Sequence, residues 1–182
     1  MTYPEDAELV GRSCKGDRGA FSALYEKYQR RVFAFCYRLT ASRETAEDAV
    51  QTTFLKAFQS LATLDDHRLF YYWLFTIARN EVFGHLRQRQ GNSVTTFLDD
   101  AEEVWDGESP HEQLVREETD ALVNRLLGQL KTEYREVLIL RQYESLSYSE
   151  IAAITGDSIS SEESRLFKAR KALAKRLAPY VL

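Results

Sequence analysis

The 182-residue chain holds only three prolines and eight glycines, so long stretches contain neither residue. Both residues interrupt helices, and their scarcity therefore favours helical structure. Within these stretches apolar residues recur three and four positions apart, which places them on one face of an α-helix. No alternating strand pattern competes with this spacing. The sequence therefore predicts an all-α protein.

The first half of the chain carries three such apolar stripes, at residues 21–39, 46–61 and 73–86. A shorter helix is expected near residues 6–15. Ser42 precedes the second stripe, and Asp65 and Asp66 precede the third, in positions suited to helix capping. Apolar residues resume at Leu122, and we expect a further helix after Thr132, a candidate cap.

The net charge of −4 is distributed unevenly along the chain. Residues 91–117 carry one Arg and eight acids, whereas residues 1–90 carry two excess positive charges and residues 118–182 carry one. The acidic segment contains glycine and proline and lacks sustained periodicity. We interpret it as a flexible linker between two small helical domains, 1–90 and 118–182. Its acids are either simply solvated or keep the basic domains from premature contact with DNA.

The second domain contains a sharply defined short helix followed by a longer basic one. Ser147 and Glu150 have capping-box spacing, and the short helix is expected to end at Gly156, which can take a left-handed conformation. The basic helix is expected from about Ser160 to Leu177. Short helix, glycine turn and longer basic helix is the order of a DNA-binding helix-turn-helix.

Several other classes of protein are disfavoured by what the sequence lacks. No apolar run approaches the roughly 20 residues of a membrane span, and no signal pattern opens the chain. Cys14 and Cys36 have no metal-ligand spacing, and nothing implies disulfides, so a reducing cytoplasm is the expected compartment. The three histidines are scattered, and no catalytic set is evident. We expect no enzymatic activity, metal or organic cofactor.

Three blocks resemble a bacterial sigma factor of the compact extracytoplasmic-function group: "ASRETAEDAVQTTFLKAFQSL", "FYYWLFTIARNEVFGHLRQRQ" and "LLGQLKTEYREVLILRQYESLSYSEIAAITGDSISSEESRLFKARKAL". The resemblance covers about residues 5–90 and 118–178. It implies a sigma region 2 and a sigma region 4 joined by a linker. It also implies a role in directing core RNA polymerase to promoters and in starting promoter melting. The partners implied are core RNA polymerase, promoter DNA and a separate anti-sigma factor.

The first block resembles the helix with which sigma factors bind core polymerase. It carries Glu47, Asp48 and Gln51 on one polar sector beside the apolar stripe. Taken without the other blocks, the same sector would fit an ordinary solvated helix face.

The second block resembles the segment that melts and reads the −10 element. Aromatic faces and basic side chains recover the cost of unstacking bases on single strands. We expect Trp73 to support the core and Tyr71 and Tyr72 to be exposed for stacking. The resemblance assigns −10 DNA to Tyr71, Tyr72, Arg79, Asn80, Arg87 and Arg89. Gly84 stands where the family often has Asp.

The third block resembles the −35-reading module, with several departures. Asp157 replaces an apolar turn residue, and Ser160 and Ser161 replace Gly-Thr. Glu162 replaces a usual Val and Glu163 a usual Lys or Arg. The resemblance assigns −35 DNA to Ser161, Glu163, Ser164, Arg165, Phe167, Lys168 and Lys171. The two acids permit three interpretations. They cap the helix, with Ser160 as the N-cap and Glu163 completing a capping box; they read a cytosine; or they weaken DNA binding.

Two rival functions stay open at this point. One is a transcriptional regulator that uses the helix-turn-helix alone, although the first two blocks have no reason to occur in a sensor domain. The other is a degenerate sigma-like protein that binds polymerase or an anti-sigma partner without normal −35 reading, a rival that Glu162 and Glu163 keep open.

Overall fold

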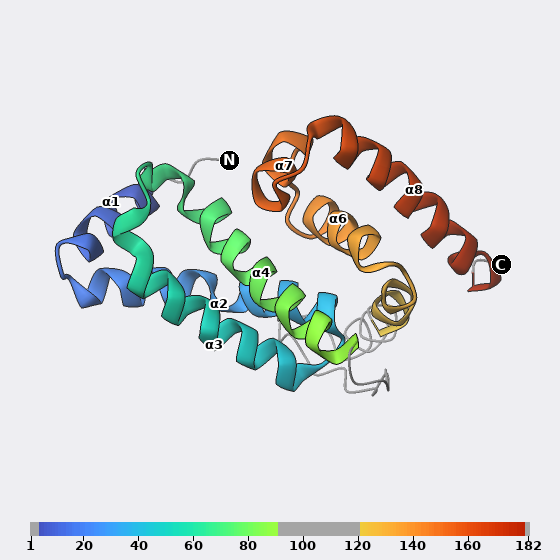
Figure 1. Ribbon diagram of the computed structural model, residues 1–182, viewed down its shortest axis with the longest axis horizontal. Coiled ribbons are helices and arrows are strands. Elements are labelled where there is room, and N and C mark those ends of the chain that lie inside the picture. The colour runs from blue at the N-terminus through green and yellow to red at the C-terminus, as the bar shows by residue number, and fades with distance from the viewer. Residues whose placement is uncertain (1–3, 91–120, 181–182) are drawn as a thin grey trace, which may run out of the picture.

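The computed structural model describes residues 4–90 and 121–180, and within these ranges every regular element is helical (Figure 1). The all-α prediction is confirmed. The first half consists of α1 (Pro4–Cys14), α2 (Arg18–Thr40), α3 (Arg43–Ser60) and α4 (Phe70–Gln90), with the 3-10 turns η1 (Leu61–Thr63) and η2 (His67–Leu69) between α3 and α4.

Short polar side chains set where these helices begin. The Asp17 carboxylate accepts a hydrogen bond from the Ala20 N–H, and the Ser42 hydroxyl accepts one from the Thr45 N–H. Asp66 caps η2 through the Arg68 N–H. Each of these acceptors satisfies a backbone donor that has no partner inside its helix. The caps predicted at Ser42 and Asp66 are confirmed, the latter at the turn that leads into α4.

The second half contains a helical segment at 121–128, followed by α6 (Thr132–Gln142), α7 (Tyr148–Thr155), α8 (Ile159–Leu177) and the turn η3 (Ala178–Tyr180). Ser147 and Glu150 form the predicted capping box, and Gly156 ends α7 with φ of +79°. Thr132 is not a cap: Lys131 occupies that position and its side chain makes no capping hydrogen bond.

The start of α8 differs from the prediction. The N-cap is Ser158, whose hydroxyl accepts a hydrogen bond from the Ser161 N–H. The helix therefore begins at Ile159, the position three residues after the N-cap is Ser161, and Glu163 lies two residues beyond it, so Glu163 cannot complete a capping box. The interpretation of Glu163 as a capping residue is wrong.

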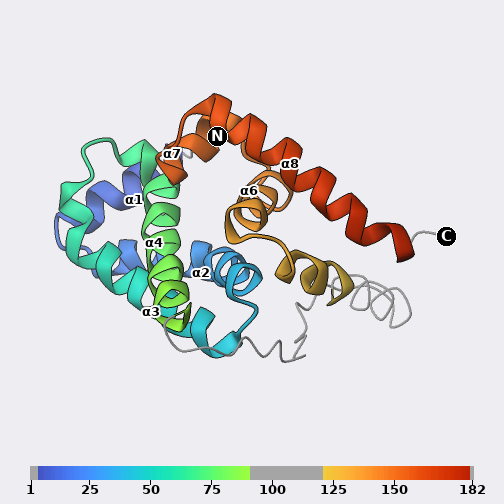
Figure 2. The ribbon, with the colours of Figure 1, turned by 45° about the vertical axis from the view of Figure 1, so that its right-hand side comes forward.

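The two halves pack against each other rather than standing apart (Figures 1 and 2). Helix α7 lies against α4, and α6 lies against α2. Buried apolar residues of both halves form one continuous core. The acidic linker predicted at 91–117 lies outside the described residues, and the domain boundaries derived from it stay a prediction.

Candidate polymerase and nucleic-acid interfaces

The outer face of α8 carries most of the residues that the sequence assigned to −35 DNA. The buried positions of α8 are Glu162, Leu166 and Ala169, spaced four and three apart, and they face α6 and α7. The opposite face is therefore open. The exposed residues of the assigned set are Glu163, Ser164, Phe167, Lys168 and Lys171.

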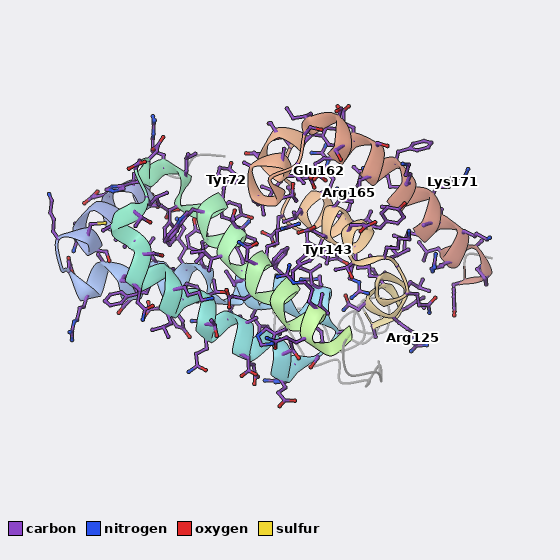
Figure 3. The ribbon with its side chains drawn as sticks, in the orientation of Figure 1. Tyr72, Arg125, Tyr143, Glu162, Arg165 and Lys171 are labelled. Carbon is purple, nitrogen blue, oxygen red and sulfur yellow. The ribbon has the colours of Figure 1, made fainter. Side chains whose placement is uncertain are left out.

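Phe167 is 72% exposed, an unusual state for a phenylalanine, and Lys171 points away from α6 (Figure 3). Aromatic and cationic side chains that project together from a recognition helix are suited to the edges and phosphates of duplex DNA.

Arg165 and Ser161 differ from the rest of the set. Ser161 is half-buried at the start of the helix. The guanidinium of Arg165 donates to Glu162 Oε1 at 2.6 Å and to Asp157 Oδ2 at 2.9 Å, so it binds two carboxylates of its own domain. In this structure Arg165 is therefore engaged within its own domain, and its assignment to −35 DNA stays a prediction.

The prediction that Tyr71 and Tyr72 are exposed is wrong: both side chains are buried. They are 2% and 9% exposed and belong to the core. Trp73, expected in the core, is half-buried and packs against its edge. The Tyr71 ring packs on Tyr28 and Phe75 of the first domain. The hydroxyls of Tyr71 and Tyr72 are covered by the second domain, a contact that local periodicity cannot reveal. The proposed action of both tyrosines on −10 DNA would require that cover to move.

The covering contact is built from cations and hydroxyls of the first domain and acids of the second. Glu144 Oε2 accepts hydrogen bonds from the Tyr71 hydroxyl at 2.9 Å and from Arg31 at 2.8 and 3.1 Å. The Tyr72 hydroxyl donates to Glu150 Oε1 at 2.5 Å, and Figure 3 shows Tyr72 between the start of α4 and α7.

Two further contacts join α2 to the second domain. The Arg38 guanidinium lies over the Tyr143 ring, 4.0 Å from its centroid. The buried Arg135 donates to the Leu39 carbonyl near the end of α2.

Arg79, a third residue assigned to −10 DNA, is also engaged across this interface. Its Nε donates to Glu136 Oε1 at 2.5 Å. Burial raises the pKa of Glu136, whereas the attraction of Arg79 lowers it and the nearby Glu162 carboxylate raises it. An acid that is 1% exposed depends on such a partner, because an unpaired buried charge is costly.

The remaining residues of the −10 set differ in position. Asn80 and Arg87 are exposed on α4, where they are accessible in this closed arrangement. The side chain of Arg89 lies outside the described residues. Gly84 leaves open space, since a Cβ added there would meet no atom within 4 Å.

The polymerase-binding candidates Glu47, Asp48 and Gln51 are all exposed on α3. Glu47 is paired with Arg43, one turn away, at 2.8 Å. Leu55 and Phe58 continue the same face and are 55% and 50% exposed. Sequence reasoning had assigned Phe58 to an apolar stripe and had not marked Leu55. A large apolar residue one turn beyond Gln51 was the signal that could have identified it.

No helix within the described ranges is long and apolar enough to span a bilayer. An all-helical chain with a helix-turn-helix, whose reading helix exposes cations and an aromatic ring, has the architecture of a DNA-binding protein.

Comparison with known families places the chain within that class. The model for sigma-70 region 2 matches residues 24–92, and a model for sigma-70 region 4 matches residues 120–173. The chain belongs to the sigma-70 family, in the extracytoplasmic-function group, and it is a sigma factor that directs RNA polymerase to promoters. The family is not one of enzymes.

Relatives are similar over nearly their whole length. The RNA polymerase sigma-H factor of Pseudomonas aeruginosa is 34% identical over 187 residues, which cover 98% of this chain and 97% of that one. The ECF RNA polymerase sigma-E factor of Escherichia coli is 33% identical over 185 residues, covering 97% and 96%.

Two solved structures share the fold. CnrH, in complex with the cytosolic domain of CnrY, has a TM-score of 0.72 and 26% identity over 96% of this chain and 98% of its own. The sigma factor RpoE of Bartonella quintana, in complex with the anti-sigma factor NepR, has a TM-score of 0.70 and 28% identity over 87% and 96%.

Proposed function

We propose that this sigma factor rests in a closed form, in which its own region 4 covers the residues that open the −10 element. The observation that carries the proposal is the coverage of Tyr71, Tyr72 and Arg79 by three acids of the second domain. Region 2 (1–90) would bind core polymerase and melt the −10 element, and region 4 (118–182) would read the −35 element. The catalysis of RNA synthesis would belong entirely to the polymerase.

The exposed face of α3 suggests the order of events. Glu47, Asp48 and Gln51 are accessible while Tyr72 is covered, so core polymerase can bind before the domains separate. Binding energy from this docking would then offset the cost of opening. Once the domains part, Tyr71 and Tyr72 can stack on unpaired bases and Arg79 can bind the backbone.

A separate anti-sigma factor is the regulator that we propose. It is supported by the two structural neighbours, both of which were solved as complexes, one explicitly with an anti-sigma factor. Such a partner would stabilise the closed form or cover the α3 face. We propose that this sigma factor acts in the cytoplasm, where core polymerase is present.

Promoter melting is tested with two substitutions at one position. Tyr72→Phe keeps the ring and removes the hydroxyl that binds Glu150, whereas Tyr72→Ala removes both. We expect run-off transcription and permanganate reactivity of unpaired thymines to persist in Tyr72→Phe and to fall in Tyr72→Ala. The control is Tyr180→Ala, an exposed tyrosine near the far end of the second domain. Full melting by Tyr72→Ala would remove Tyr72 from the melting surface.

Core binding is tested by reversing one charge on α3. Asp48→Lys should weaken co-purification with core polymerase, whereas Glu8→Lys makes the same charge change at an exposed position on α1 and should not. Equal binding by both variants would contradict the assignment of the α3 face.

A further inference from the structure

The helix-turn-helix contains a buried acid that the proposed reading of DNA does not use. Glu162 is 0% exposed and lies at the fourth position of α8, facing inward. Its Oε1 accepts hydrogen bonds from the Thr155 hydroxyl at 2.8 Å and from Arg165 at 2.6 Å. Within the described part of the chain its Oε2 has no hydrogen-bond partner. A carboxylate in this state is stabilised mainly by the guanidinium beside it.

Arg165 is fixed from two sides. It binds Glu162 from its own helix and Asp157 from the turn, and its side chain is 19% exposed. The two contacts hold the guanidinium against the junction of α7 and α8 (Figure 3). To reach a base, Arg165 would have to leave two carboxylates and strand one of them in the interior, which is strongly unfavourable.

We propose that Glu162 is a specificity-determining residue that acts through Arg165. Glu162 withdraws Arg165 from −35 DNA, and the base preference is set instead by the exposed residues Glu163, Lys168 and their neighbours on α8. This inference rests on the proposed −35 role of region 4. The two adjacent acids of α8 therefore have different roles. Glu162 is internal and positions an arginine, whereas Glu163 lies on the reading face.

The exposed charges of α8 are compatible with the withdrawal of Arg165 from DNA. Without Arg165, the exposed side of α8 retains Lys168, Arg170 and Lys171 beside Glu163. Phosphate binding depends on the number of cations, so it proceeds through these three side chains and without Arg165.

The thermal test uses the full chain. Arg165→Ala leaves Glu162 buried without its cation, so we expect the melting temperature to fall. Glu162→Val places an apolar residue in the same buried site, and the double variant Glu162→Val with Arg165→Ala should recover most of the loss. A residue whose only role is to contact DNA would give no fall and no rescue. Absence of both would overturn the proposal.

The specificity test uses holoenzyme and a promoter library randomised in the −35 element. Arg165→Ala should select the same −35 bases as the unaltered chain, whereas Lys168→Ala should change them. Releasing Arg165 with Glu162→Val and Asp157→Asn should add a preference of about fivefold or more for guanine at one position, because a freed arginine binds guanine in bidentate fashion. Adding Arg165→Ala to that pair should abolish the new preference.

The outcomes separate this inference from the proposed function. If the unaltered holoenzyme selects no −35 bases at all, the −35 role of region 4 is wrong, and the thermal rescue still decides whether Glu162 holds Arg165. If selection works and Arg165→Ala erases it in the unaltered background, Arg165 reads DNA itself and the inference is overturned.

Discussion

Glu144 is the residue whose loss should open the closed form most directly. One of its oxygens accepts three hydrogen bonds from the first domain, two from Arg31 and one from the Tyr71 hydroxyl. The Arg31 guanidinium also lies 5.0 Å from the Tyr71 ring centroid. Glu144→Ala removes the acceptor for all of these donors without altering any residue of region 2.

The expected magnitude follows from the geometry. A hydrogen bond to a charged group contributes about 1.5–3 kcal/mol, and three that share one oxygen are not additive. The Arg31 side chain is 38% exposed, so water replaces part of what it loses. We expect Glu144→Ala to cost about 2–3 kcal/mol. For a chain of this size, about 2–4 °C of melting temperature per kcal/mol gives a fall of about 4–12 °C.

The assay combines calorimetry with hydrogen exchange. Amides of α4 and α7 should exchange faster in Glu144→Ala, whereas those of α3 should not. Core polymerase should bind the variant more tightly, because less binding energy is spent on opening. The matched control is Glu133→Ala, an acid of α6 that is exposed. A melting temperature within about 1 °C of the unaltered chain, with unchanged exchange in α4, would refute the reasoning.

Three further predictions concern single positions. Burial raises the pKa of the Cys36 thiol to about 12, so only the exposed Cys14 should react with a thiol reagent until the chain unfolds; two fast thiols in the native chain would contradict this. Gly84→Ala should stabilise the chain by about 0.5–1 kcal/mol, because a Cβ there meets no atom and alanine restricts the unfolded state; a lower melting temperature would contradict it. Burial raises the pKa of Glu136 above 4.5, so its charge reduces stability progressively as pH rises from 4.5 through the folded pKa. The stability of the unaltered chain minus that of Glu136→Gln should therefore be greater at pH 4.5 than at pH 7.5, and an equal difference at both pH values would contradict it.

Local features of the fold were predictable because their causes are local. The capping box of Ser147 and Glu150 and the left-handed turn at Gly156 depend only on residues within one helix end. The start of α8 was not predictable in the same way, since Ser158, Ser160 and Ser161 all lie near it and each has a hydroxyl able to cap. The backbone conformation decides for Ser158.

The candidate sites show the same division. The exposure of Asp48 and Gln51 follows from the periodicity of one helix, and the structure agrees with it. The hydroxyls of Tyr71 and Tyr72 are bound by Glu144 and Glu150, which are more than 70 positions away. No periodicity within α4 contains that information.

The central claim is that region 4 covers the melting face until polymerase is bound, and one distance tests it most directly. The exposed Cys14 of α1 and a cysteine introduced by Lys171→Cys on α8 can be labelled as a pair, because Cys36 is buried. The two sites lie on different domains, toward opposite ends of the molecule (Figures 1 and 3). In the free chain we predict a single narrow distance distribution, set by the closed arrangement, and in the holoenzyme we predict a different distance. A broad distribution in the free chain, or a distance that polymerase leaves unchanged, would contradict the claim.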